Sequence, residues 1–276
     1  MRALRNTKLP LLLSGLLVFC PTLHASEVQT QKSYITAGLG IEQLSYQEKI
    51  PDLALASTDT ELSNWILYLE GQKAMAPFFV GVKGYIPLTD DDTREAWYLD
   101  GLLEQSNSLS YKRMGLDGYF GYGLHPLLNP YVGINWGYTE QTRSNFQNND
   151  SPGTLALTAT EEVYSLSALL GLKGNIPFTP SWSFFYAAEF MLPFYSETTN
   201  DSLPDWKASD VGGYAYTLAA RLQYTITQTL SAAAWLRGGR QHWAGSPWSP
   251  VDGTRVKWPE NDTDFLGTFI SLSLYF

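Results

Sequence analysis

The C-terminal stretch FLGTFISLSLYF, residues 265–276, predicts how the whole chain folds. Successive side chains of a β-strand point to opposite faces, so alternate residues share a face. One face is almost wholly apolar: Leu266, Thr268, Ile270, Leu272, Leu274 and Phe276. The other face is small, polar or aromatic: Gly267, Phe269, Ser271, Ser273 and Tyr275. An apolar strand at the edge of a soluble sandwich is one interpretation, but such an edge invites aggregation. A closed barrel has no edge and can turn its apolar face to lipid, so we favour a barrel.

The N-terminus predicts export from the cytoplasm. Residues 1–25 carry three cations, then an apolar run over residues 9–19, and end on the small residue Ala25. This arrangement is typical of a cleaved secretory signal peptide and is too short for a membrane span. The chain's one cysteine, Cys20, lies inside this leader. We therefore expect the remaining domain, residues 26–276, to be stable without disulfides.

Composition points to a membrane β-barrel. Aromatic residues make up 14% of the chain and charged residues 16%, against about 25% charged residues in soluble domains. No later stretch has the roughly 18 consecutive apolar residues of a membrane helix. The formal charge is −9, and loss of three leader cations makes it −9 − 3 = −12. Such a negative chain is not expected to bind nucleic acid.

Period-two alternation predicts about ten strands in an all-β, up-and-down antiparallel barrel. The pattern is clearest over residues 181–196 and 211–226, where seven apolar residues recur at every second position, which no helix face allows. The ten predicted strands cover residues 33–47, 62–74, 77–88, 108–123, 130–141, 161–174, 181–196, 211–226, 229–243 and 264–276. The last strand is expected to pair with residues 229–243 and to close onto residues 33–47.

The links between these strands alternate between short and long, which predicts the orientation in the membrane. Long links cover residues 48–61, 89–107, 142–160, 197–210 and 244–263. Outer-membrane barrels keep short turns in the periplasm and long loops outside. Most acidic residues fall in the long links, so we expect an acidic external surface. A solvated rim explains this charge, although the run Asp90-Asp91-Asp92 also suits a divalent cation bridging to anionic lipopolysaccharide.

The polar faces of the strands predict a charge network inside the barrel. Four acids and five bases are expected to point inward: Glu42, Glu70, Asp117, Glu189, Lys83, Arg113, Lys173, Arg221 and Arg237. Charges in a narrow lumen must pair or stay hydrated, because an unpaired buried charge is costly. We favour a plugged lumen over a small pore lined by the same groups. Arg221→Leu is expected to leave Glu189 or another inward acid unpaired.

With its leader, alternating strands, long loops and terminal LSLYF, the chain resembles bacterial outer-membrane β-barrel proteins. The resemblance is one of architecture and covers residues 33–276. Ten strands with tall acidic loops are similar to the omptin proteases, which implies two aspartates facing an aspartate–histidine pair. The second long link supplies Asp90, Asp91 and Asp92, but the fourth has Asp201 and Asp205 without a histidine. The chain therefore departs from the omptin catalytic pattern.

A search for other catalytic groups leaves one weak candidate. His242 is the histidine expected at the outer end of a strand, and with Asp90 and Asp92 it is the candidate set for a hydrolase. Lipid-modifying outer-membrane enzymes pair a histidine with a nearby serine, but neither His125 nor His242 stands in a His-x-Ser pattern. We find no constellation of Cys and His for a metal and predict no cofactor.

The sequence therefore predicts an integral outer-membrane protein with a non-enzymatic surface or envelope role. The alternatives are an omptin-like or lipid-modifying hydrolase and a narrow diffusion channel. Expected partners are outer-membrane lipid and lipopolysaccharide, an extracellular ligand of the loops, and the barrel-assembly machinery. The resemblance implies that the terminal residue, Phe276, helps insertion by that machinery.

Overall fold

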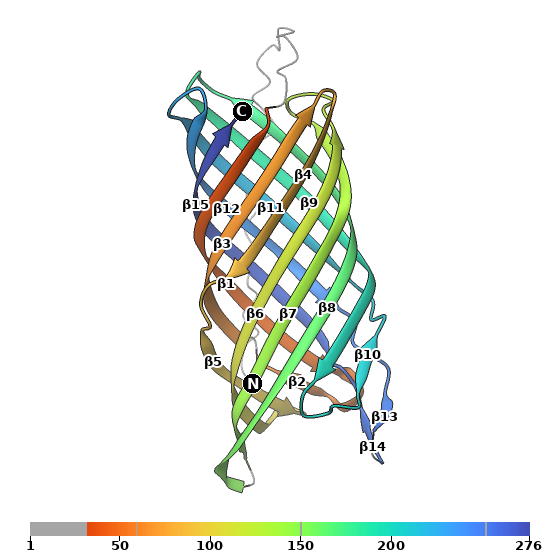
Figure 1. Ribbon diagram of the computed structural model, residues 1–276. Helices are drawn as coiled ribbons and strands as arrows, with labels where there is room; N and C mark the ends of the chain where they lie inside the picture. Colours follow the sequence, from red (N-terminus) through yellow and green to blue (C-terminus); the bar gives the residue numbers. More distant parts are fainter. Residues whose placement is uncertain (1–31, 59, 150, 252) are drawn as a thin grey trace.

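The computed structural model describes residues 32–58, 60–149, 151–251 and 253–276, with only the backbone of residues 151–156. Ten long antiparallel strands form one sheet that closes into a tall barrel (Figure 1). In order around the wall they are β1 (Tyr34–Ile50), β3 (Thr60–Met75), β4 (Phe78–Pro87), β6 (Leu102–Tyr122), β7 (Asn129–Asn148), β8 (Ser151–Pro177), β9 (Trp182–Asn200), β11 (Gly213–Thr225), β12 (Leu230–Trp243) and β15 (Glu260–Tyr275). The predicted signal peptide, residues 1–25, lies outside the described residues.

The last strand closes the barrel as predicted. β15 pairs with β12 on one side and with β1 on the other. The seam between β1 and β15 runs from Tyr34 opposite Tyr275 to Lys49 opposite Glu260. Each of the ten predicted segments corresponds to one long strand, which confirms an all-β, up-and-down barrel.

The alternation in residues 265–276 separates the two faces of the wall. Ile270 and Leu272 are 70% and 56% exposed on the outside, whereas Ser271 and Ser273 are buried in the lumen. Around the outer wall this apolar belt lies between two rows of exposed aromatic side chains. The row toward the long loops holds Trp65, Trp136, Tyr195, Tyr214 and Tyr216, and the row toward the short turns holds Phe78, Phe120, Tyr122, Trp182 and Tyr224. Such girdles mark the two membrane interfaces of an outer-membrane barrel.

Among the described residues, no helix has the length and apolar character needed to cross a membrane.

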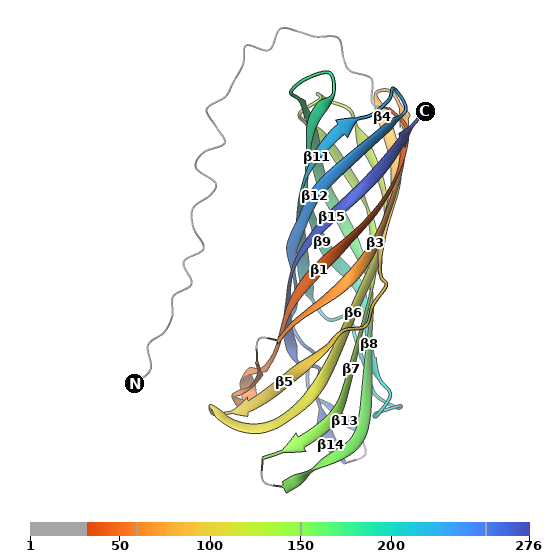
Figure 2. The ribbon, with the colours of Figure 1, turned by 90° about the vertical axis from the view of Figure 1, so that its left-hand side faces the viewer.

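Two predicted long links are mostly strand. Residues 89–107 contain β5 (Asp92–Leu99) and the start of β6, and residues 142–160 are covered largely by the ends of β7 and β8. Figure 2 shows β5, β6, β7 and β8 extending to the long-loop end of the barrel, at the bottom of the view. Beyond the membrane the outer face no longer has to be apolar, so the alternation that reveals a strand fades there.

Smaller elements complete the long-loop end. β2 (Leu55–Ser57) and β5 pair with each other, and β10 (Lys207–Ser209) pairs with β9. β13 (Ser249–Val251) and β14 (Thr254–Val256) form a separate hairpin, and a 3-10 turn, η1, covers Pro51–Leu53. Trp206, Trp243 and Trp258 are buried together beneath these segments. The long-loop end is therefore a packed structure.

Glycines inside the wall make room for aromatic rings. Gly121 lies opposite the fully buried Phe79, and a Cβ at Gly121 would come within 2.1 Å of that ring.

We expect Gly121→Ala to lower the free energy of unfolding by about 1–3 kcal/mol through overpacking. Urea unfolding in detergent micelles measures the change. Gly71→Ala is the matched control, since a Cβ there meets nothing within 4 Å; equal effects of the two substitutions would contradict the prediction.

Candidate functional site

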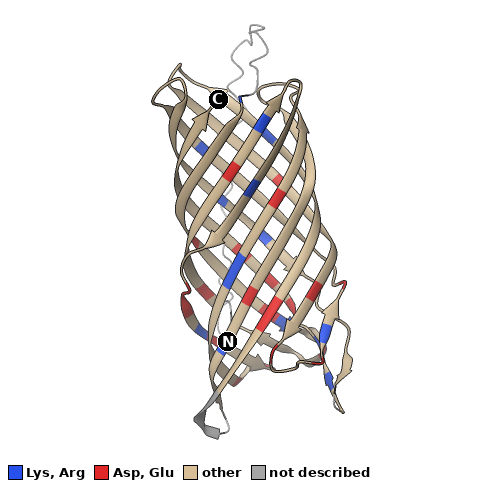
Figure 3. Cartoon of the chain, viewed as in Figure 1, with Lys and Arg blue, Asp and Glu red and all other residues tan. Residues whose placement is uncertain are grey.

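The nine charged side chains predicted to point inward line the lumen, where they form layers. Figure 3 shows acidic and basic positions at different heights along the strands. Nearest the middle of the wall, Lys83 contacts Glu189 and lies 3.4 Å from an Asp117 carboxylate oxygen. The Tyr131 hydroxyl donates to Glu189 over 2.5 Å. This layer joins β4, β6, β7 and β9 across the lumen.

A second layer lies toward the short turns and centres on Glu70. Three tyrosine hydroxyls donate to its carboxylate, from Tyr34 at 2.7 Å and from Tyr68 and Tyr119 at 3.0 Å. The Lys173 ammonium lies 4.5 Å from the centre of the Tyr119 ring. Hydroxyl donors satisfy a buried carboxylate without a direct ion pair.

Arg221 does not pair with Glu189, and the loss of another inward acid's partner in Arg221→Leu stays a prediction. Its guanidinium lies 4.7 Å from the centre of the Phe185 ring. The register explains the difference: Arg221 is opposite Phe185, whereas Glu189 is opposite Thr217. Four residues of extended strand span roughly 13 Å, and Lys83 reaches Glu189 from β4 instead.

A third layer closes the lumen toward the long loops. Arg113 forms a two-pronged ion pair with Glu42, at 2.9 and 3.0 Å, and Arg237 adds a contact at 3.6 Å. The Glu42 side chain is 0% exposed and the Arg113 side chain 5%. The Arg113 guanidinium also stacks 3.6 Å from the centre of the Phe265 ring. The layer is therefore both charge-paired and densely packed.

The two halves of the lumen differ in how they are filled. A cavity of about 1550 Å³ occupies the short-turn half and is lined by residues of all four short turns. Beyond the Glu42 layer, Tyr46 and Tyr111 pack 4.9 Å apart within a buried cluster that includes Leu44 and Leu109. The lumen is thus open toward one end and filled like a protein core toward the other.

A buried group of three carboxylates around one arginine lies above that apolar cluster. Arg143 is 2.7 Å from Glu95 and 3.0 Å from Glu48. Glu161 accepts a hydrogen bond of 2.7 Å from the Trp258 indole instead. Burial, and next the neighbouring charge of Glu48, raise the pKa of Glu161 to about 7. One carboxyl of the group is thus poised to hold a proton near neutral pH.

This group corrects the prediction that the acids of the long links lie on the surface. Glu48 and Glu95 are 1% and 0% exposed. Sequence reasoning missed them because it ended the strands too early. Continuing the alternation two at a time from Glu42 through Leu44 and Tyr46 reaches Glu48 on the inward face. An extended period-two reading could therefore have found it.

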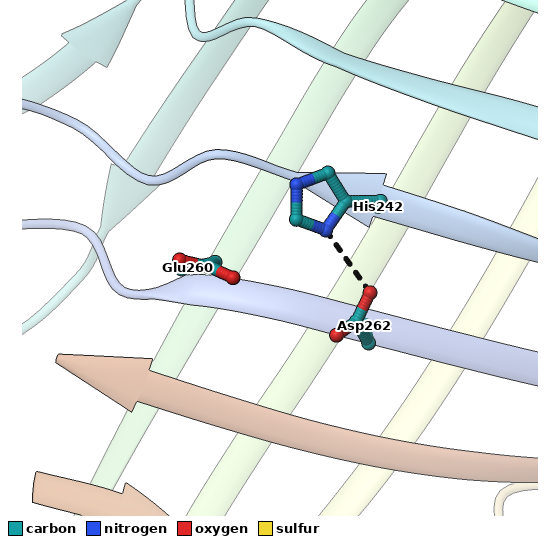
Figure 4. Close-up of side chains that lie close together, drawn as sticks. All are labelled: His242, Glu260 and Asp262. Atoms are coloured by element: carbon teal, nitrogen blue, oxygen red, sulfur yellow. Dashed lines mark hydrogen bonds and ion pairs between the residues drawn. The ribbon is translucent and has the colours of Figure 1, made fainter. Parts of the chain in front are cut away.

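The three candidate catalytic residues do not come together. His242 and Asp262 face outward on β12 and β15, with 3.0 Å between Nδ1 and a carboxylate oxygen (Figure 4). Asp90 forms an ion pair of 2.8 Å with Lys112 of β6, and Asp92 is exposed on β5. Strands β15, β1, β3 and β4 lie between β12 and β6 around the wall. Because the wall is convex, outward side chains this far apart cannot converge on one substrate.

Comparison with known proteins is informative at the level of the fold. No protein-family model matches the sequence, and a search of curated proteins finds no match either. Among solved structures, the outer-membrane protease OmpT of Escherichia coli is similar, with a TM-score of 0.64 and 11% identity over 90% of this chain and 100% of that chain. The chain has an outer-membrane β-barrel fold.

A second similar structure is the translocator domain of the autotransporter NalP from Neisseria meningitidis. Its TM-score is 0.41, with 9% identity over 90% of this chain and 91% of that chain. The likeness to OmpT, at the higher TM-score, is the one that shows the fold. Outer-membrane barrels keep short turns in the periplasm and long loops outside, and the same orientation stays the expectation for this chain.

Proposed function

We propose that the protein is a non-enzymatic, non-conducting outer-membrane barrel that acts through its long-loop end. The observation that carries this proposal is the filling of the lumen. The Glu42 layer, the apolar cluster around Tyr46 and Tyr111 and the group around Arg143 are stacked along the path that a solute would follow. A barrel whose outer half is filled like a protein core acts at its outer surface, in a surface or envelope role.

The same features weigh against the alternatives. A diffusion channel needs a continuous hydrated path, and a narrow barrel filled by side chains has none. A hydrolase of omptin-like type needs its histidine and aspartates in one cleft, whereas His242 and Asp90 face outward on different parts of the wall. The acidic long-loop end is left as the surface that meets a ligand, lipid or neighbouring cell.

Conductance in planar lipid bilayers tests the closed lumen. We expect the refolded wild-type protein, residues 26–276, to insert without producing current steps, because the packed layers leave no water-filled path. Insertion is checked by heat-modifiable gel migration of the same sample. Reproducible current steps from correctly folded protein would overturn the non-conducting part of the proposal.

Hydrolysis assays test the non-enzymatic part. Refolded protein is offered basic peptides and lipid A, and no turnover above a denatured control is expected. Turnover that His242→Ala abolishes would establish the hydrolase instead, whereas turnover unchanged by His242→Ala would indicate a contaminating enzyme.

A further inference from the structure

Three side chains of the outer wall form a cluster that the closed lumen does not explain. His242 and Asp262 are directly opposite each other on β12 and β15, and Glu260 lies two residues before Asp262 on the same face. One potential ligand atom from each residue lies within 4.8 Å of the other two. Figure 4 shows the imidazole and both carboxylates gathered at the ends of the two strands.

The cluster lies at the outer girdle and is open to its surroundings. The His242 and Asp262 side chains are 23% and 26% exposed. The Tyr214 ring packs 5.2 Å from the imidazole and holds it against the wall from the β11 side. The cluster is therefore positioned by strands but accessible from outside.

Among the described residues, neither Lys nor Arg forms a direct ion pair with Glu260 or Asp262. Arg240, the next residue on the same face of β12, is engaged by Asp264 at 2.6 and 2.7 Å. Lys49 is opposite Glu260 in the seam with β1, but the ion pairs of the described residues include none between them. Two carboxylates on one face repel each other, and a cation between them would remove that repulsion.

We propose that His242, Glu260 and Asp262 bind one divalent metal ion of the zinc class. One imidazole and two carboxylates suit zinc and its transition-metal neighbours, while calcium and magnesium prefer oxygen ligands alone. Zinc ligands at 2.0–2.2 Å lie about 3.4 Å from one another. The present spacing is 3.0 Å between His242 Nδ1 and Asp262 and at most 4.8 Å within the cluster, so only small adjustments are needed. Three protein ligands leave a fourth position facing away from the barrel, open to water or to a phosphate of the surrounding outer leaflet.

This site is independent of the proposed function, because it lies on the outer wall and takes no part in closing the lumen. It also lies apart from the loop aspartates Asp90, Asp91 and Asp92, which suggested divalent cations from sequence alone. The composition of the chain provides a matched control for a metal-binding test. Residues 26–276 contain no cysteine, and His125 is the other histidine besides His242. His125 belongs to a short turn at the opposite end of the barrel.

The experiment is zinc titration of refolded protein without a histidine tag, by competition with a chromophoric chelator. Wild type and His125→Ala are expected to bind one equivalent of Zn²⁺ with equal affinity. His242→Ala is expected to weaken binding by at least about tenfold, and Glu260→Gln and Asp262→Asn each to weaken it, since each variant removes a ligand. Unchanged gel migration and circular dichroism show that the variants fold.

Cobalt substitution adds a readout of geometry. Co²⁺ is expected to give visible absorption bands with wild type and His125→Ala but not with His242→Ala, and a tenfold excess of Ca²⁺ is expected to leave the bands in place. No binding by the wild type, undiminished binding by His242→Ala, or loss of binding only in His125→Ala would overturn the proposal.

Discussion

Arg113→Leu is expected to destabilise the barrel by about 3–5 kcal/mol, the typical cost of breaking a buried ion pair by removing one partner. Glu42 is fully buried and would keep only the 3.6 Å contact from Arg237. The substitution also removes the guanidinium that stacks on Phe265. A charge left without its partner, rather than the loss of attraction itself, accounts for most of the expected cost.

The urea midpoint of refolded protein in detergent micelles measures this effect. Glu42→Gln in the Arg113→Leu background is expected to recover part of the loss, because the uncompensated charge is then gone, and the double-mutant cycle isolates the coupling between the two residues. Lys207→Ala is the control: its ion pair with Glu197 is exposed, and the midpoint is expected not to move. A midpoint for Arg113→Leu equal to that of Lys207→Ala would show that the pair contributes nothing to the closed layer.

Glu161→Gln is expected to stabilise the protein above neutral pH by up to about 3 kcal/mol, the free energy that corresponds to the pKa difference between 4.5 and about 7. The sign follows from linkage. Below pH 4.5 the carboxyl is protonated in both the folded and the unfolded chain, so the folded state bears no penalty. Between pH 4.5 and about 7 the unfolded chain releases this proton while the folded chain keeps it, so wild-type stability falls. The loss is complete once the pH has risen through 7 and the buried carboxyl has ionised beside Glu48.

Glutamine keeps the oxygen that accepts from the Trp258 indole and cannot ionise, so the variant should lose this part of the pH dependence. Urea midpoints measured from pH 4 to pH 8 test the prediction. At pH 4 wild type and variant are expected to agree, which serves as the internal control, and at pH 8 the variant should be more stable. A wild-type protein that becomes more stable relative to the variant between pH 4 and pH 8 would reverse the assigned sign.

The membrane-spanning half of the barrel could be predicted from the sequence. Lipid on one side and a polar lumen on the other impose a strict alternation, as in residues 265–276, where Ile270 and Leu272 face out and Ser271 and Ser273 face in. That constraint specifies each strand, its inward charges and the closure of β15 onto β1. It acts on every residue between the two aromatic girdles, so the alternation predicts all ten strands from the single sequence.

Beyond the outer girdle, only the tertiary structure decided which groups meet. There water replaces lipid, the outer face becomes polar, and the strands that carry Glu95 and Arg143 lose the alternation that would reveal them. Pairing across the lumen depends on register, as Arg221 opposite Phe185 and Lys83 against Glu189 show. The cluster of His242, Glu260 and Asp262 likewise arises from the pairing of β12 with β15, which places residues eighteen and twenty positions apart in one patch. Contact with lipid or water constrains each residue separately and leaves a local pattern in the sequence. Strand pairing joins residues that are far apart in the chain and leaves no such local pattern.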